Sequence, residues 1–139
     1  MAETIYRGGY WYGFSRVAFA NCEAIAAGTS KEWPVFAAPC RIRIKKVSIL
    51  AQAAITGADT NYFTLGCKFK GAAGTGTASV VSKAFTLNVN AAAFDRTDLG
   101  TPSSAIVNPG EVISFHKTET GTGMASPDIV VQIEYIRVQ

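Results

Sequence analysis

The sequence has few charged residues and no long apolar run. Charged side chains make up 17% of the 139 residues, against about 25% in an average globular chain. The net charge of +3 is too small to indicate a nucleic-acid partner by itself. No stretch approaches the roughly 18 consecutive apolar residues of a membrane-spanning helix. We therefore expect neither nucleic acid nor membrane as a partner. A surface with so few charges either consists of glycine, threonine and alanine or is covered by a partner.

Paired cysteines and a secretory signal are also missing. Cys22, Cys40 and Cys67 are an odd set without CxxC spacing, which argues against a disulfide framework or a zinc site. We interpret them as buried thiols of a reducing compartment. Glu3 and the early glycines interrupt any apolar leader, and no N-x-S/T sequon occurs. We expect synthesis in the cytoplasm of a host cell.

The side chains that would support catalysis or metal binding are scarce. His116 is the single histidine, no serine lies in a GxSxG motif, and we interpret His116 as a solvent-facing or interface residue of a strand. Asp95 and Asp98 could bind calcium together with loop carbonyls, but an Asp–Thr loop of this kind more often caps its own turn. We predict no catalytic residue, no metal site and no cofactor.

Glycine-rich segments separate the rest of the chain into short pieces. Residues 71–77 lack the Lys-Ser/Thr ending of a P-loop, and residues 118–128 do not fit GxGxxG. We interpret both as connections between strands, whose small side chains let another backbone approach closely.

Period-two alternation of apolar and polar residues is the strongest structural signal. The expected strands cover residues 16–20, 33–37, 40–50, 60–70, 81–89, 111–117 and 129–138. Residues 20–27 and 90–94 could each form a helical turn or two. Six to eight strands with almost no helix predict an all-β antiparallel sandwich, or jelly roll, over residues 16–139.

Two strands carry a further local prediction. In residues 40–50 the parity of the apolar residues changes between Ile44 and Val47, so we expect a bulge or bend near Lys45. Pro34 lacks a backbone N–H and places its strand at a sheet edge or makes it a strand start.

The same segment carries a stripe of basic residues. Arg41, Arg43 and Lys45 fall on one side of the expected strand, with Lys46 beside them. Such a stripe could bind phosphates or a negatively charged protein surface, or it could be a solvated strand face. Because no aromatic residues alternate with the stripe, we favour an acidic protein patch over nucleic acid.

The densest aromatic cluster lies at the start of the chain, around RGGYWYGFSR (residues 7–16). Its rings are Tyr6, Tyr10, Trp11, Tyr12 and Phe14. Each ring can bury about 150–250 Å², whereas the same rings in water form an aggregation-prone segment. We predict an N-terminal arm over residues 1–15. The rings either close one end of the protein's own sandwich or lie across a neighbouring subunit or a larger scaffold.

Residues 55–85, the VNPGE turn with the strands after it (107–135) and the aromatic arm resemble the small jelly-roll decoration (cement) proteins of tailed-bacteriophage heads. The resemblance is one of pattern and covers about residues 40–139. It implies a non-enzymatic homotrimer on the capsid exterior that bridges major capsid protein subunits through its arm and the base of its sandwich. On this resemblance the partner-binding residues are those of the arm, Tyr6, Tyr10, Trp11, Tyr12 and Phe14.

One alternative stays open: a fibre, tail or head appendage domain that binds a host receptor or glycan. Jelly rolls serve both roles, so the fold does not separate them. Exposed aromatic residues in a concave loop pocket, flanked by Asp and Asn, would favour sugar binding. Aromatic residues confined to the arm would favour a cement protein. A cupin-like metal enzyme needs several histidines, which this sequence does not have.

Overall fold

The chain forms strands and turns throughout the part that the computed structural model describes, residues 14–139. Within this part there is no helix, and hence none that is long and apolar enough to cross a membrane. The strands are β1 (Ser15–Cys22), β2 (Lys31–Ala37), β3 (Ile42–Ala51), β4 (Tyr62–Gly71), β5 (Ala78–Ala84), β6 (Arg96–Asp98), β7 (Ile106–Val107), β8 (Val112–Thr120) and β9 (Ile129–Arg137).

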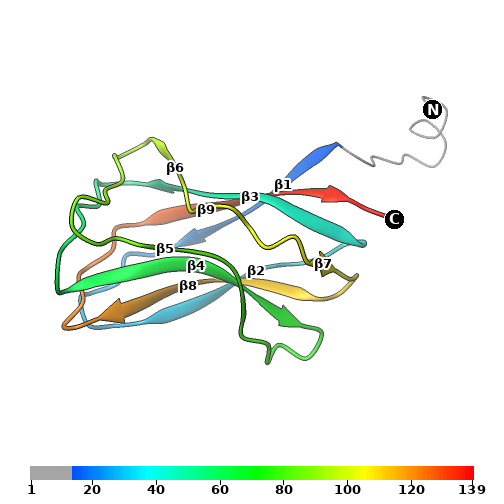
Figure 1. The fold of residues 1–139 in the computed structure, drawn as a ribbon, viewed down its shortest axis with the longest axis horizontal. Coiled ribbons are helices and arrows are strands. Elements are labelled where there is room, and N and C mark those ends of the chain that lie inside the picture. Colours follow the sequence, from blue (N-terminus) through cyan, green and yellow to red (C-terminus); the bar gives the residue numbers. More distant parts are fainter. Residues whose placement is uncertain (1–13) are drawn as a thin grey trace.

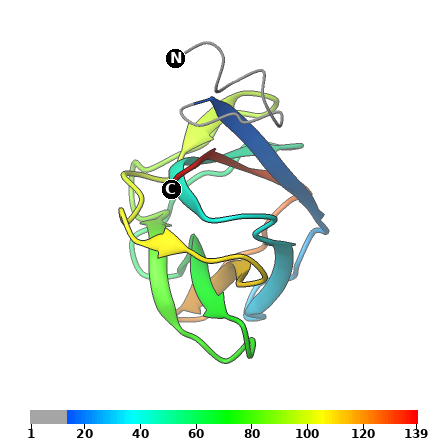
Figure 2. The ribbon, with the colours of Figure 1, turned by 90° about the vertical axis from the view of Figure 1, so that its right-hand side faces the viewer.

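The strands build two antiparallel sheets that pack face to face (Figures 1 and 2). One sheet has the order β1-β9-β3-β6, with β7 also paired to β3, and the other has the order β2-β8-β4-β5. The chain crosses from one sheet to the other between β1 and β2, β2 and β3, and β3 and β4. This interleaving is the strand order of a jelly roll, so the predicted fold class is confirmed.

The core lies between the two sheets and follows the alternation seen in the sequence. Along β9, Ile129, Val131, Ile133 and Tyr135 are buried, while the residues between them are half-buried. Phe63, Phe85 and Phe115 are fully buried in the same core. Burial of such side chains stabilises the fold by about 1.5–3 kcal/mol each.

The two local predictions for the strands are confirmed. The pairing of β3 with β9 shifts register between Ile44 and Lys46, so a bulge at Lys45 keeps apolar residues on the core side of both halves of β3. Pro34 lies in β2, which is an edge strand of its sheet, and the pairing of β2 with β8 shifts just after it.

The expected strand over residues 81–89 is wrong in extent. β5 ends at Ala84, and the chain then turns, with Asn88 in the left-handed region at φ 68°. Phe85 is buried as expected, but Leu87 is 58% exposed. The alternating apolar residues after Ala84 belong to a loop beside the sheet. The period-two pattern alone does not distinguish such a loop from a strand.

The expected helical turns over 20–27 and 90–94 are also wrong. In the first segment β1 continues to Cys22, and Ile25 forms an isolated bridge with Ser126. In the second segment Ala91 and Ala93 form isolated bridges of their own. Backbone N–H and C=O groups in these two segments thus form hydrogen bonds with other segments of the chain, whereas in a helix they would bond within the segment.

The predicted arm lies almost entirely outside the described residues, of which Phe14 and Ser15 are the first. The division into an arm (1–15) and a sandwich (16–139) therefore stays a prediction. β1 begins at Ser15, beside Ile136 near the end of β9.

Candidate functional site

The edge strand β1 exposes large apolar side chains. Val17 is 52% exposed and Phe19 65% exposed, and Phe14, just before the strand, is 50% exposed. Ala18 and Ala20 point the other way and pack against the core. Apolar side chains gathered on one edge in this way are typical of a surface that another molecule covers.

The backbone edge of β1 lacks the usual protection against pairing with another chain. Natural edge strands are protected by proline, bulges or several charges, and β2 has Pro34 with an adjacent register shift. β1 has Arg16 as its single charged residue and pairs with β9 over eight consecutive residues without a shift. Within the described residues β1 pairs with β9 alone and is therefore an edge strand of its sheet.

Of the predicted arm residues only Phe14 is described, and it is half exposed. Tyr6, Tyr10, Trp11 and Tyr12 lie outside the described residues. Their role in partner binding stays a prediction.

The three residues of the predicted basic stripe differ in their contacts. Arg41 donates from Nη1 to the carbonyl of Gln139, and Arg43 donates from Nε to the carbonyl of Ser104 at 3.1 Å. Lys45 lies at the bulge and is exposed. Two of the three predicted stripe residues thus contact neighbouring backbone, and partner binding by the stripe stays a prediction.

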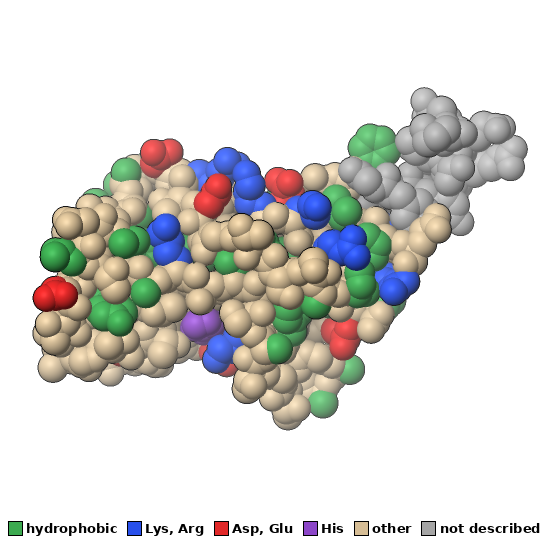
Figure 3. Space-filling view, viewed as in Figure 1, with side chains coloured by type: hydrophobic (Ala, Val, Ile, Leu, Met, Phe, Trp, Pro, Cys, Tyr) green, Lys and Arg blue, Asp and Glu red, His purple; other side chains and the backbone are tan. Residues whose placement is uncertain are grey.

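Other charged residues are exposed on the surface, some of them as pairs of opposite charge. On the face shown in Figure 3, several Lys and Arg side chains lie along the upper part of the molecule, with Asp and Glu side chains among them. Lys46 lies 3.9 Å from Asp98, between their Nζ and Oδ2 atoms. Exposed pairs of this kind contribute about 0–1 kcal/mol.

His116 is buried, which corrects the expectation that it faces solvent or an interface. It is 8% exposed, and its Nδ1 lies 3.0 Å from Oγ1 of Thr118. The ring fits because the facing residue on β4 is Gly66, where a Cβ would lie 2.8 Å from His116 Nε2. Desolvation and, second, the charge of Lys68 lower the pKa of His116.

The aspartates of the 94–100 loop make local contacts. Asp95 accepts a hydrogen bond from the backbone N–H of Arg96 at 2.9 Å, which agrees with turn capping. Asp98 Oδ1 lies 3.6 Å from Nε of Arg96. Among residues 14–139 no group of three His, Cys, Asp or Glu side chains is placed to hold a metal ion.

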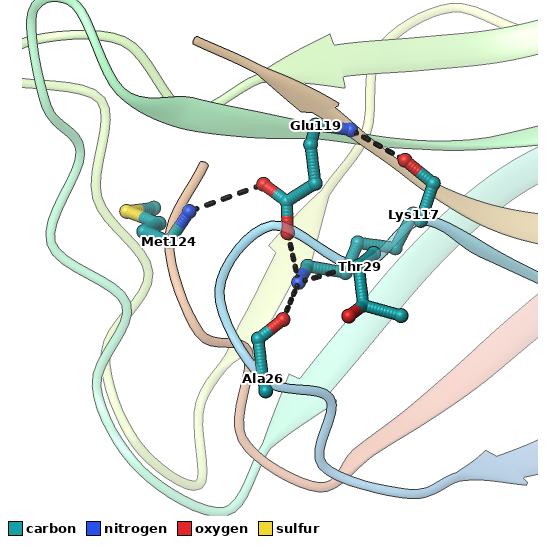
Figure 4. Close-up of polar contacts among 6 residues, drawn as sticks. Ala26, Thr29, Lys117, Glu119 and Met124 are labelled. Carbon is teal, nitrogen blue, oxygen red and sulfur yellow. Dashed lines mark hydrogen bonds and ion pairs between the residues drawn. The ribbon is translucent and has the colours of Figure 1, made fainter. Parts of the chain in front are cut away.

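A buried lysine, which the sequence analysis did not single out, ties two loops together (Figure 4). Lys117 donates from Nζ to the carbonyls of Ala26 at 3.1 Å and Thr29 at 3.2 Å, and forms an ion pair with Glu119. Glu119 also accepts a hydrogen bond from the N–H of Met124 at 3.1 Å. The sequence did contain a signal for this burial: Lys117 lies two residues after Phe115, and residues two apart in a strand face the same side of the sheet.

A pocket of about 560 Å³ lies at the end of β1 opposite to Phe14. It forms where β1 ends at Cys22, β3 ends at Ala51 and β9 begins at Ile129. Leu50 and Val130 add further aliphatic surface. This is the size range of small-ligand sites, which are mostly apolar with a few polar groups.

Phe94 stands at this pocket on an unusual backbone. It is 81% exposed and has φ 57°, in the left-handed region. Its N–H donates to the carbonyl of Ala51 at 2.9 Å, which anchors the turn beside the pocket. A bulky residue rarely adopts this conformation, and local periodicity gave no indication of it.

The polar residues of the pocket include two amides and two carboxylates, Asn21, Gln52, Glu23 and Asp128. Asp128 accepts the N–H of Ala24 at 2.8 Å through Oδ1. Glu23 pairs with Lys31 and accepts the indole N–H of Trp33 at 2.8 Å. These hydrogen bonds, that of Lys31 first, lower the pKa of Glu23 to about 2.

A scan of protein-family models and a search of curated proteins found no match. Among solved structures the chain is similar to viral capsid proteins. A chain of the infectious bursal disease virus Gx strain has 13% identity and a TM-score of 0.33, over 92% of this chain and 38% of that chain. A chain of the T13 particle of that virus has 11% identity and a TM-score of 0.35, over 91% and 36%.

A third similar chain, from T=1 particles derived from the same virus, has 10% identity and a TM-score of 0.36, over 92% of this chain and 37% of that chain. The chain thus spans less than two fifths of the length of these capsid proteins. Similarity at this level identifies no family, and the function is inferred from the residues of this chain.

Proposed function

We propose that this protein is a non-enzymatic structural protein of a virion that binds the outer surface of a bacteriophage capsid. There it bridges and stabilises major capsid protein subunits. The observation that carries the proposal is the edge strand β1, which exposes Val17 and Phe19 and is preceded by the exposed Phe14. In the sequence these residues directly follow the aromatic segment that contains Tyr10 and Trp11.

The edge strand provides two kinds of contact at once. Its free backbone can pair with an extended segment of a partner, and its side chains can bury apolar surface. Covering Phe14, Val17 and Phe19 contributes about 1.5–3 kcal/mol for each side chain, less the free energy needed to order the contact. Repetition over a lattice strengthens modest contacts, since neighbouring sites raise the effective concentration.

The proposal includes self-association, with a homotrimer as the expected unit on the capsid exterior. A trimer presents three copies of β1 and of the arm to the capsid, so that one particle can contact several subunits. The low share of charged residues, 17% of the sequence, supports contact with neighbours over a broad area.

Sedimentation with capsids that lack the protein tests the proposal. Purified protein is mixed with such capsids, and bound protein is measured in the pellet. We expect deletion of residues 1–13 and the double variant Val17→Ser/Phe19→Ser each to lower occupancy about tenfold or more, a loss of at least ~1.4 kcal/mol.

Leu87→Ser is the matched control, because Leu87 is 58% exposed, close to the 52% of Val17, but lies in the loop after β5. It should leave occupancy unchanged. Thermal unfolding of each variant separates loss of binding from loss of folding. Unchanged occupancy after both the deletion and the double substitution would remove β1 and the arm from the capsid contact.

The open alternative, a domain that binds a host glycan, also gains a specific observation. An exposed aromatic residue, Phe94, lies at a pocket together with Asp128 and Asn21. This arrangement lies at the Cys22 end of β1, opposite to Phe14.

A further inference from the structure

The exposed ring of Phe94 is unfavourable for the isolated protein in two ways. It leaves a large apolar surface in water, and its left-handed backbone at φ 57° costs on the order of 1–3 kcal/mol. The hydrogen bond from its N–H to Ala51 maintains this geometry. Strained residues of this kind concentrate at ligand sites, so the ring is placed for contact with a ligand in the pocket.

The pocket is lined by both apolar and hydrogen-bonding side chains. Leu50 and Val130 supply aliphatic surface beside Phe94, while Asp128 and Asn21 supply polar atoms. One carboxylate oxygen of Asp128 accepts the N–H of Ala24, which orients the side chain and leaves its second oxygen for a ligand. A pyranose has matching parts: one apolar face of C–H groups to pack on a ring, and hydroxyls to donate to a carboxylate and bond to an amide.

The charge of the pocket selects against anionic ligands. The described residues that line it include no lysine or arginine, so nothing there compensates an anionic ligand. Of its two carboxylates, Glu23 is already paired with Lys31. One carboxylate, that of Asp128, remains, and a single hydrogen-bonded carboxylate suits hydroxyl donors of an uncharged ligand.

We propose that this pocket binds an uncharged sugar residue, with Phe94 stacked on the sugar's apolar face and Asp128 and Asn21 bonded to its hydroxyls. The pocket lies at the Cys22 end of β1, opposite to Ser15, the residue at which the predicted arm joins the strand. On the proposed capsid-binding function, the arm end faces the capsid and the sugar site faces away from it. The site then meets polysaccharide outside the virion.

The test uses the full-length protein and a panel of methyl glycosides of glucose, galactose, mannose and N-acetylglucosamine, with methyl glucuronide as an anionic comparison. Saturation-transfer NMR and titration calorimetry measure binding. We expect at least one uncharged glycoside to bind with a Kd of about 1–10 mM, near −3 to −4 kcal/mol. The saturation transfer should be strongest on the ring C–H protons, and glucuronide should bind about tenfold more weakly.

Variants identify the site. Phe94→Ala and Asp128→Asn should each weaken sugar binding about tenfold or more, Phe94→Tyr should retain it, and the control Leu87→Ala should not change it. Sugar binding that survives both Phe94→Ala and Asp128→Asn, or no binding of any uncharged glycoside at ~50 mM, overturns the proposal. A synthetic peptide of residues 1–14 that binds this pocket while the sugars do not also overturns it.

The capsid assay keeps the two proposals apart. Phe94→Ala should leave capsid occupancy unchanged, and deletion of residues 1–13 should leave sugar binding unchanged. Loss of capsid binding in the first variant, or of sugar binding in the second, would contradict the separation of the two sites.

Discussion

Lys117 and Glu119 form an ion pair at the end of the sandwich, where the Lys117 side chain has no exposed surface and that of Glu119 is 8% exposed. The two residues follow each other on the same side of β8, and their contacts reach the 23–30 loop and the 121–124 turn (Figure 4). The pair therefore positions loops at the same end of the molecule as the pocket.

Breaking this pair should be strongly destabilising. Glu119→Gln leaves the buried charge of Lys117 without its counter-ion, and we expect a loss of about 3–5 kcal/mol in the free energy of unfolding. Urea denaturation measures it. In the double variant Glu119→Gln/Lys117→Met the total loss should be smaller than the sum of the single losses by about 1–3 kcal/mol. Simple additivity would show that the two side chains do not act as a pair.

His116 should make stability depend on pH below about 7. The unfolded histidine titrates near pH ~6.5, while burial lowers its pKa in the folded protein. As the pH falls through this window, the unfolded chain takes up a proton that the folded chain does not, so stability decreases. Urea midpoints from pH 8 to 4 should show this slope in the wild type and a flatter profile in His116→Gln. An identical slope in both proteins would contradict the assignment.

Acid should destabilise the protein further through two glutamates. Hydrogen bonds lower the pKa of Glu23 to about 2, with Lys31 as the main cause, and the hydroxyl of Ser114 lowers the pKa of Glu32. Stability from both is present above their unfolded pKa of about 4.3 and is lost as the pH falls below it. Ser114→Ala should weaken the acid resistance by raising the pKa of Glu32. NMR titration of the Glu32 carboxyl carbon checks this, and an unchanged pKa would exclude Ser114 as the cause.

Gly57 should not tolerate a side chain. A Cβ there would lie 1.9 Å from the carbonyl oxygen of Thr86 and 2.4 Å from that of Val89, and both obstacles are backbone. We expect Gly57→Ala to lower the free energy of unfolding by about 1–3 kcal/mol or more. Gly74 is the control, because its Cβ position is open and Ala there bears only the left-handed penalty of about 1–2 kcal/mol. Equal losses at the two positions would show that the loop after β5 moves aside.

The left-handed backbone at Phe94 should lower the stability of the folded protein. Glycine relieves the left-handed backbone strain that alanine keeps. We therefore expect Phe94→Gly to be more stable than Phe94→Ala by about 1 kcal/mol, although both remove the ring. Thermal unfolding compares the two proteins. A less stable glycine variant would mean that residue 94 is not held at positive φ in solution.

Thiol reactivity should differ among the three cysteines. Burial raises the pKa of Cys22 to about 12 and also raises that of Cys67, so neither forms the reactive thiolate near neutral pH. Cys40 is half-buried. A thiol reagent should modify Cys40 first in the native protein, and all three in urea. Rapid native labelling of Cys67 would contradict the packed core.

The strands and their irregularities were predictable because each depends on neighbours in the sequence. Alternation along residues 129–138 shows which side of β9 meets the core, and the parity change after Ile44 shows the bulge. Pro34 marks an edge strand because it lacks one hydrogen-bond donor. All three inferences use local geometry.

The residues that were missed depend on partners far away in the sequence. His116 is buried because Gly66, on another strand, leaves room for its ring. The pocket exists because β1 and β3 end where β9 begins, and because the turn with Phe94 lies at the same place. The pattern of residues within one segment does not show which distant segments it contacts. The candidate sugar site was therefore found only in the structure.

The position of β9 between β1 and β3 affects how the chain reaches its native state. β1 has no partner among the described strands until residues 129–137 have left the ribosome. Until then the backbone edge of β3 that pairs with β9 lacks this partner and can pair with other chains. Folding therefore completes after translation of the last strand, and a nonsense change ahead of Ile129 should yield aggregates rather than a shortened sandwich.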